Sequence, residues 1–241
     1  MLHKTRGIVL HSIKYSETSI IAHIYAEEFG RQSYLVKGVY RKKSSVSIAL
    51  FYPLNLLEME VYYKPGSNLQ KIKEAYNNPI YNLIPSDPQK KAIVVFLSEV
   101  LYRSLREEES SPRLFSFIFN SLQILDLKTQ PVSNFHLIFL FQLSKFIGFF
   151  PLNNYSASEP IFDLLNGRFV SEPPMHGHFI NFEESKIFAS MITKGFDDSE
   201  GIKLSRELRQ YLLEKLVEYY RLHIENMGKV KSLQVLKEVF D

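Results

Sequence analysis

The sequence predicts an α+β protein in which an N-terminal β region precedes a mostly α-helical region. Short runs of β-branched and aromatic residues, separated by turn-forming residues, recur at roughly ten-residue spacing up to about residue 76. Beyond Pro79 the apolar residues recur at helical spacing instead. With 241 residues, 45% of them hydrophobic, the chain has the composition of a globular protein and can form one large domain or two small ones.

Five candidate strands precede residue 77. They are GIVLHSIKY, SIIAHIYA, RQSYLVKG, LNLLEMEVYY and NLQKIKEAY. Gly30 supplies the positive φ that a tight turn requires, and Pro65-Gly66 is typical of a type II turn. Short antiparallel strands in so few residues favour a closed sheet, because closure removes exposed edges. We therefore expect a five-stranded OB-type barrel, a fold that commonly binds single-stranded nucleic acid on one face.

Helix signals follow the strands. Asp87-Pro88 and Ser111-Pro112 each place a capping side chain before a proline at the first helical position. A third helix is expected from about Ser133 to Ile147, ending before Gly148, which suits a left-handed C-cap. Three further helices are expected near residues 183–192, 205–226 and 231–240.

One segment of the helical region, residues 151–180, shows no clear helical periodicity. Asn166-Gly167, between IFDLL and RFV, predicts a β-hairpin with a type I′ turn, since both central positions of that turn need positive φ. We therefore expect a nucleic-acid-binding barrel domain at residues 1–80 and a helical domain at residues 81–241. The helical domain would carry a small β insert at about residues 151–180.

The chain contains no cysteine, which excludes disulfides and thiolate metal sites and fits a reducing compartment. Its N-terminal stretch lacks the apolar run of a signal peptide, and no segment approaches the roughly 18 apolar residues of a membrane span. The richest candidate, FHLIFLFQLSKFIGFF, is interrupted by Gln142, Ser144 and Lys145. We expect a cytoplasmic protein with no membrane partner.

The formal net charge of +3 is unevenly distributed along the chain. Residues 1–80 hold eleven basic and six acidic side chains, a net charge of +5, which leaves −2 for the remainder. A basic module joined to a mildly acidic one is typical of a polyanion-binding head, and a solvated basic face is the alternative. The candidate DNA-binding residues are Lys4, Arg6, Arg31, Tyr34, Lys37, Tyr40, Arg41, Lys42, Lys43, Lys64 and Lys71.

The densest basic stretch is KGVYRKKSS, residues 37–45, and no acidic residue occurs between Glu28 and Glu58. Lys and Arg side chains that approach a phosphate backbone release counterions, which gives sequence-independent and salt-dependent binding. We expect this stretch to be a strand end and a basic loop at the rim of the barrel. Four tyrosines interleave with the cations and are candidates for stacking on bases, with filling of the barrel as the alternative for each: Tyr34, Tyr40, Tyr62 and Tyr63.

Metal and catalytic motifs are weak. His176 and His178 supply two nitrogen ligands, whereas a closed zinc site needs four, so surface histidines are the preferred interpretation. The acidic run at residues 197–200 is a candidate magnesium site for phosphodiester hydrolysis, but the glycines that flank it favour a solvated loop. We expect no enzyme activity, no cofactor and no metal. An OB-fold RNA-binding protein and a metal-dependent nuclease are the alternatives.

The chain resembles the RecO family of DNA repair proteins in segments that follow one another along nearly its whole length. The most specific is GIVLHSIKYSETSIIAHIYAEEFGRQSYLVKGVYRKKSS, in which Tyr15, Glu17, Gly30, Lys37, Gly38 and Ser44 have familiar spacings. Then come FYPLNLLEMEVYYKPGSNLQKIKEA, FLSEVLYRSLREEESSPRLFSFI, FIGFFPL and the closing YYRLHIENMGKVKSLQVLKEVF.

This resemblance implies a recombination mediator with an OB-fold, a helical body and no catalytic site. It implies that the protein binds single- and double-stranded DNA without strong sequence preference, anneals complementary single strands and assists RecA loading on DNA coated with single-stranded DNA-binding protein. The implied partners are RecR, the C-terminal tail of the single-stranded DNA-binding protein, RecF and RecA.

Many members of the family carry four zinc-binding cysteines just after the position of Pro151. This chain departs from that pattern, because it has Asn153, Asn154 and Ser156 there. The insert is therefore expected to hold without metal, supported by Phe162, Leu164, Phe169 and Val170.

The tail implied for the single-stranded DNA-binding protein is acidic and ends in phenylalanine. Such a peptide requires an apolar slot for its ring and cations for its carboxylates. We expect the helical domain to supply both, with the slot on the helix that begins near Phe135. The candidate residues are Phe135, Phe139, Lys145, Arg206 and Arg209.

Overall fold

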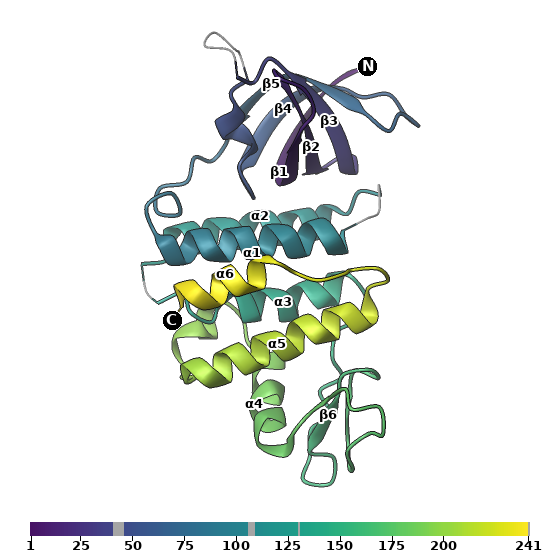
Figure 1. Cartoon of the computed structure of the whole chain (residues 1–241), viewed down its shortest axis with the longest axis vertical. Helices are drawn as coiled ribbons and strands as arrows, with labels where there is room; N and C mark the ends of the chain where they lie inside the picture. Colours follow the sequence, from purple (N-terminus) through teal and green to yellow (C-terminus); the bar gives the residue numbers. More distant parts are fainter. Residues whose placement is uncertain (41–45, 106–108, 130, 241) are drawn as a thin grey trace. The chain divides into compact units, whose positions relative to one another are not determined.

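The computed structural model describes residues 1–40, 46–105, 109–129 and 131–240, and the chain divides into two compact units, Met1–Leu127 and Lys128–Asp241 (Figure 1). The first unit contains the strands of the N-terminal region and the two helices that follow them. The boundary expected at residue 80 therefore lies inside this unit, between its strands and its helices.

The first unit is built on five strands that form a closed barrel in the order β1-β2-β3-β5-β4, with β4 pairing back to β1. The predicted OB-type barrel is thus confirmed. Its strands are β1 (Leu2–Lys14), β2 (Ser19–Ala26), β3 (Gly30–Lys37), β4 (Leu56–Tyr62) and β5 (Gln70–Asn77), with a short 3₁₀ turn, η1 (Ile48–Phe51), between β3 and β4.

One pair of neighbouring strands differs from the expectation that all would be antiparallel. β3 and β5 run parallel, through the pairs Tyr34↔Gln70 and Leu35↔Lys71. The reason is geometric: strand direction cannot alternate all the way around a closed ring with an odd number of strands. A five-stranded barrel therefore needs one parallel pair, and here that pair closes the sheet.

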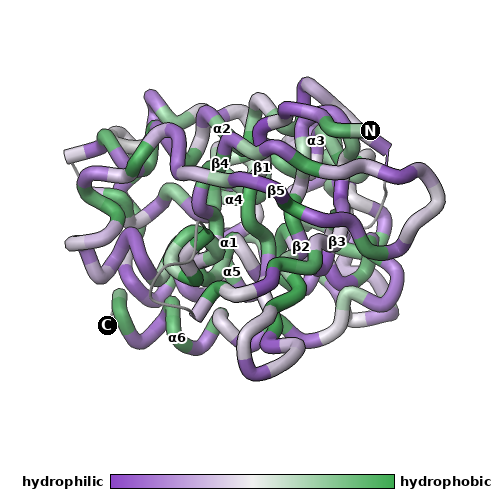
Figure 2. The backbone as a smooth tube through the Cα atoms, turned by 90° about the horizontal axis from the view of Figure 1, so that it is seen from above, coloured by the Kyte–Doolittle hydropathy of each residue, from purple (hydrophilic) through white to green (hydrophobic). Residues whose placement is uncertain are grey.

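The barrel interior is filled by alternate residues of each strand, as the period of two requires. Viewed from above, the tube of the barrel strands carries both hydrophobic and hydrophilic stretches (Figure 2). The buried cluster includes Val9, Ile20, Ala22, Ile24, Tyr34, Val36, Leu57, Met59 and Val61. Residues that point outward from the same strands contact solvent or helices.

Helices α1 (Pro88–Ser104) and α2 (Pro112–Leu127) complete the first unit. Asp87 caps α1 as predicted, because its side chain accepts hydrogen bonds from the backbone N–H groups of Gln89 and Lys90. The helix is tied to the barrel by Ser98, whose hydroxyl donates to the carbonyl of Leu10 at 2.5 Å.

A buried carboxylate joins α2 to the chain that leaves the barrel. Asp126 accepts hydrogen bonds from the backbone N–H groups of Asn82, Leu83 and Ile84 at 2.8–2.9 Å. Its carbonyl also accepts from the ammonium of Lys90 at 2.8 Å. These bonds satisfy three donors that the irregular segment before α1 cannot pair within itself.

The second unit is mostly helical and carries a small three-stranded sheet of order β7-β6-β8. Among the described residues, no helix combines the length and apolar character that crossing a bilayer requires. The elements of the second unit are α3 (Phe135–Phe146), β6 (Ile161–Asp163), β7 (Arg168–Val170), β8 (Phe179–Ile180), α4 (Phe182–Ile192), η2 (Asp197–Glu200), α5 (Arg206–His223) and α6 (Ser232–Val239).

The predicted hairpin is present as β6 and β7, but its turn is not the expected type I′ turn. The strands pair from Ile161↔Val170 to Asp163↔Arg168, which leaves a four-residue loop in which Gly167 has positive φ. The carboxylate of Asp163 organises this loop by accepting the N–H groups of Leu165 and Asn166. An Asx-type turn therefore replaces the two-residue turn.

The insert holds together through hydrogen bonds and aromatic packing. The Asn154 amide accepts from the N–H of Phe169 and donates to the carbonyl of the same residue, at 2.9 and 3.0 Å. Phe162 and Phe169 are buried and meet edge to face with ring centroids 4.8 Å apart. One asparagine thus bridges the chain after Pro151 to β7.

Replacing Asp126 by alanine should lower the free energy of unfolding of the first unit by about 2–4 kcal/mol, because three backbone donors lose their acceptor. Asp126→Asn, which keeps one carbonyl oxygen, should cost less. Thermal unfolding followed by circular dichroism measures both. A midpoint for Asp126→Ala equal to that of the wild type would contradict this role.

The purified protein should contain no stoichiometric zinc. His176 Nε2 lies 3.3 Å from Asp163, and His178 Nδ1 lies 2.7 Å from Glu218, so each imidazole already has a carboxylate partner. In the described part of the chain, no three His, Cys, Asp or Glu side chains are grouped to hold a metal ion. Elemental analysis after dialysis tests this expectation. One zinc per chain, with a melting temperature lowered by chelator, would overturn it.

Candidate nucleic-acid interface

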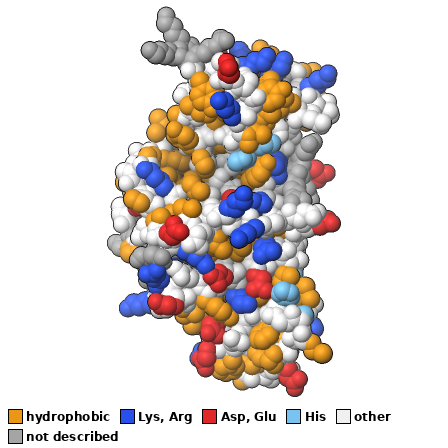
Figure 3. Space-filling model, in the orientation of Figure 1, with side chains coloured by type: hydrophobic (Ala, Val, Ile, Leu, Met, Phe, Trp, Pro, Cys, Tyr) orange, Lys and Arg blue, Asp and Glu red, His pale blue; other side chains and the backbone are white. Residues whose placement is uncertain are grey.

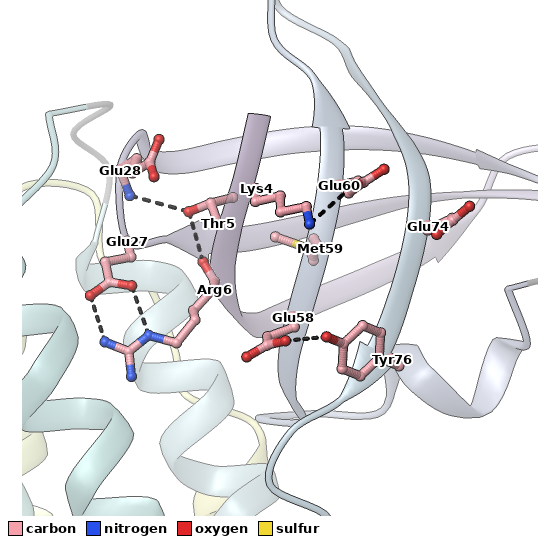
Figure 4. Close-up of a pocket in the computed structure, with 10 residues that line it drawn as sticks. All are labelled: Lys4, Thr5, Arg6, Glu27, Glu28, Glu58, Met59, Glu60, Glu74 and Tyr76. Carbon is pink, nitrogen blue, oxygen red and sulfur yellow. Dashed lines mark hydrogen bonds and ion pairs between the residues drawn. The ribbon is translucent and has the colours of Figure 1, made fainter. Parts of the chain in front are cut away.

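The outer surface of the barrel is divided by charge. On the side formed by β1, β4 and β5 lies a groove of about 400 Å³, which we call the acidic groove (Figure 4). Its charged lining is five glutamates and two basic residues: Glu27, Glu28, Glu58, Glu60, Glu74, Lys4 and Arg6. A phosphate backbone that entered this groove would meet an excess of like charge.

Lys4 and Arg6, two of the candidate DNA-binding residues, lie in the acidic groove. The ammonium of Lys4 is 3.8 Å from Glu60, and its side chain is 86% exposed. Arg6 forms a two-pronged pair with Glu27 at 2.5 and 2.7 Å. Its hydrogen bond lowers the pKa of the Glu27 carboxyl, which therefore stays charged at neutral pH.

Arg6 also has a packing role in the first unit. Its guanidinium lies over the rings of Phe115 and Phe119 in α2, 5.2 and 4.7 Å from their centroids. The side chain thus joins β1, the Glu27 turn and α2. Two of its donors are bonded to Glu27, so Arg6 has a structural role although its side chain is 40% exposed.

Arg31, another candidate, is also engaged inside the first unit. Its Nη1 donates to the carbonyls of Tyr102 and Leu105 at 2.9 and 2.7 Å, where α1 ends. The guanidinium lies 4.5 Å from the centroid of the Tyr102 ring. A cation at a helix C-terminus satisfies carbonyls that have no partner within the helix, so Arg31 caps α1.

Tyr34 requires a correction. Its side chain is 0% exposed and belongs to the barrel core, so no face of its ring is open to a base. Burial raises the pKa of its hydroxyl far above the usual range. The alternative stated for the tyrosines, filling of the barrel, holds here because Tyr34 shares the inward face of β3 with Gln32 and Val36.

Three other candidates are exposed and do not line the acidic groove. Lys37 ends β3, Lys71 lies on β5, and Lys64 begins the turn between β4 and β5. Tyr62, on β4, pairs with Lys71 and is 51% exposed. We call Lys37, Lys64, Lys71 and Tyr62 the basic face. Figure 3 shows basic side chains interspersed with apolar ones over the barrel.

The β4–β5 turn of the basic face is held by a buried side chain that sequence reasoning did not single out. The Gln70 amide accepts from the N–H of Lys64 and donates to the carbonyls of Lys64 and Ser67, all at 2.9–3.0 Å. Gln70 also pairs with Tyr34 where β5 meets β3. Only its place in an inward position of a strand could have signalled this role.

Beside Lys71, apolar side chains form a row on the outer surface of the barrel that crosses β3, β2 and β1. The pairing places Leu35 next to Lys71, Ile21 next to Leu35 and Ile13 next to Ile21. Ile13 is exposed, and Ile21 and Leu35 are partly exposed. The sequence analysis missed them, although SIIAHIYA is apolar on both faces of the strand, which signals a use for the outer face.

Tyr40 is 49% exposed and directly precedes the segment that contains three further candidates. Arg41, Lys42 and Lys43 lie outside the described residues. Tyr63, unlike Tyr62, stacks on Phe29 with ring centroids 4.0 Å apart. Of the four tyrosines considered for stacking, Tyr40 and Tyr62 therefore offer exposed rings, whereas Tyr34 does not and Tyr63 is already stacked.

The candidate tail-binding residues of the second unit are not all brought together. Phe135 and Phe139 are buried in its core, so neither ring forms an open slot. Lys145 lies over Phe150 near the C-terminal end of α3. His136, which lines a pocket with Arg206 and Arg209, lies near the other end of α3, about 14 Å away at the helical rise of 1.5 Å per residue. This burial and separation correct the predicted slot.

Arg206 and Arg209 do share a site. Both line a small pocket with His136, Gln210, Leu213 and three residues from α6 or its end, Leu236, Lys237 and Phe240. Arg209 is fixed there by donating to Asn134 and to the carbonyl of Leu204, at 3.0 and 3.1 Å. These two arginines are the members of the predicted set that lie beside one apolar pocket.

The acidic run at residues 197–200 forms the short turn η2. Asp198 accepts the N–H of Gly195 at 2.9 Å and lies 4.0 Å from the ammonium of Lys194. The side chains of Ser199 and Glu200 lie outside the described part of the structure. Asp198 thus stabilises its own turn, in line with the loop interpretation.

Comparison with known proteins places this architecture in one family. The model for "Recombination protein O N terminal" matches residues 1–77, and that for "Recombination protein O C terminal" matches residues 85–234. Curated relatives named DNA repair protein RecO include those of Phocaeicola vulgatus, at 42% identity over 100% of both chains, and Flavobacterium psychrophilum, at 37% identity over 98% of both chains. The RecO protein of Bacteroides fragilis is 42% identical, again over 100% of both chains. The chain therefore belongs to the RecO family of DNA repair proteins.

Proposed function

We propose that the protein is a recombination mediator that binds DNA through the basic face without strong sequence preference and anneals complementary single strands. The observation that carries this proposal is the distribution of charge on the barrel: exposed lysines and an exposed tyrosine lie around the β3–β5 pair and the β4–β5 turn, whereas five glutamates line the acidic groove. Lysines that contact phosphates and not base edges bind DNA independently of its sequence. Tyr62 and the apolar row beside it offer surface on which bases can stack.

The proposed contacts differ from residue to residue. Lys37, Lys64 and Lys71 bind phosphates, Tyr40 and Tyr62 stack on bases, and Arg6 and Arg31 hold the helices to the barrel. Arg41, Lys42 and Lys43 are included as phosphate contacts on the strength of their charge alone. Both single and double strands are proposed ligands, since phosphate binding does not distinguish them by sequence.

Annealing follows physically from this arrangement. Lysine contacts to phosphates reduce the repulsion between two complementary strands, and they leave the base edges free to pair. Assistance to RecA on strands coated with single-stranded DNA-binding protein further requires contact with that protein. We propose Arg206 and Arg209 as cations for its acidic tail. RecR, RecF and RecA are proposed partners from family membership, as is a cytoplasmic, nucleoid-associated location.

The double variant Lys37→Gln/Lys71→Gln should weaken binding to single-stranded DNA about tenfold or more at 0.1 M salt. The slope of log affinity against log salt should become shallower by about 1.4, which corresponds to two lost phosphate contacts. The matched control is Lys4→Gln/Lys73→Gln, which removes the same charge beside Glu60 of the acidic groove. Fluorescence anisotropy with a labelled oligonucleotide measures both. Equal losses in the two double variants would show that only net charge matters.

The proposed mediator activity is tested with complementary strands precoated with single-stranded DNA-binding protein. The wild-type protein should accelerate annealing of naked and coated strands. Lys37→Gln/Lys71→Gln should slow both reactions, whereas Arg206→Glu should slow only the coated one. Failure of the wild type to accelerate either reaction would refute the proposal, as would full activity of the lysine double variant. Cleavage of labelled DNA in magnesium would instead support the nuclease alternative.

A further inference from the structure

The pocket beside Arg206 and Arg209 is already filled by part of the same unit. Phe240 lies against His136, with ring centroids 5.8 Å apart, and lines the pocket with Leu236. The space that remains there is about 10 Å³, barely enough for one water molecule. An aromatic side chain from α6 thus takes the position that an incoming ring would need.

The rim of this pocket suits an anionic peptide. Arg206 and Arg209 lie beside the apolar surface of Leu213 and His136, which α6 covers with Leu236 and Phe240. His136 adds no positive charge at neutral pH, because burial and the nearby Arg209 lower its pKa to about 3. An apolar surface beside two arginines matches a peptide that carries one terminal ring and several carboxylates.

Helix α6 is a short cover, held at this pocket by Leu236, by Phe240 and by an ion pair between Lys237 and Glu214. It has eight residues, and helices of that length are marginal without tertiary contacts. Leu236 and Phe240 lie one turn apart on its inner side, while Val235 is exposed. The linker before α6 is anchored separately by the buried Met227 and Val230. Opening of α6 would therefore break its own contacts, including the Lys237–Glu214 ion pair, and would leave the linker in place.

We infer that α6 is a latch that occupies the tail site with Phe240 and must open before a phenylalanine-ended acidic peptide can bind. This inference rests on the proposed tail site at Arg206 and Arg209. The apparent affinity for the tail is then the affinity of the open state multiplied by the fraction of molecules that are open. Coupling of this kind lets the chain hold its partner weakly until α6 is displaced.

The test uses the full chain and a fluorescent peptide of several aspartates followed by a C-terminal phenylalanine. Phe240→Ala should raise the affinity for this peptide about tenfold, the gain expected when a latch closed about nine-tenths of the time is removed. Val235→Ala, on the exposed side of α6, is the matched control and should leave affinity unchanged. Phe240→Leu keeps an apolar plug and should give a smaller gain.

Hydrogen exchange gives a second readout that needs no variant. Saturating peptide should speed exchange of the α6 amides in the wild-type chain, because the helix is displaced. Unchanged or slower exchange in α6 would refute the latch, whatever the variants show.

Two further variants separate failure of the latch from failure of the tail site. Arg206→Glu should abolish peptide binding, whereas Lys203→Glu, the same charge change at an exposed neighbouring position, should not. If both variants bind like the wild type, the tail site itself is wrong and the latch falls with it. If only Arg206→Glu loses binding but Phe240→Ala binds like the wild type, the tail site stands and the latch is refuted.

Discussion

Closure of the barrel by the parallel β3–β5 pair is the constraint on which the proposed interface depends. That pair consists of only two residue pairs, and Gln70 takes part in one of them. The same side chain fixes the β4–β5 turn through three hydrogen bonds to Lys64 and Ser67. Closure therefore sets the positions of Lys64 and Lys71 together, and Lys71 lies between Leu35 and Tyr62. A barrel left open at this edge would have no continuous basic face.

The basic residues of the barrel divide by chemistry. The arginines of the strands are used for structure: Arg6 pairs with Glu27 and stacks on two phenylalanines, and Arg31 caps α1 over Tyr102. The planar, multidentate guanidinium suits such contacts, whereas the compact lysine ammonium suits loose contact with phosphate. Lysines that remain exposed away from glutamates are then the ones available to a nucleic acid. Charge counted along the sequence cannot make this distinction.

Much of the fold could be predicted from local patterns. The period-two runs gave the five strands, and Asp87-Pro88 gave the start of α1. The alternation in GRQSYLVK already places Tyr34 on the same face as Val36, so its burial was accessible to sequence reasoning. Arg31 is different, because its partners lie more than seventy residues away, at the end of α1. Likewise, Asn166-Gly167 could not reveal that Asp163 would reorganise its turn.

Cross-linking tests the division of the barrel surface most directly, because two tyrosines form a matched pair. Tyr62 is 51% exposed on the basic face, and Tyr76 is 57% exposed in the acidic groove. Tyr76 pairs with Glu58, four residues before Tyr62 on β4, or about 13 Å along the strand. Ultraviolet cross-linking of the full chain to single-stranded DNA, followed by peptide mass spectrometry, should find the nucleotide on Tyr62 and not on Tyr76. Cross-links on Tyr76, or equal yields at the two positions, would contradict the account.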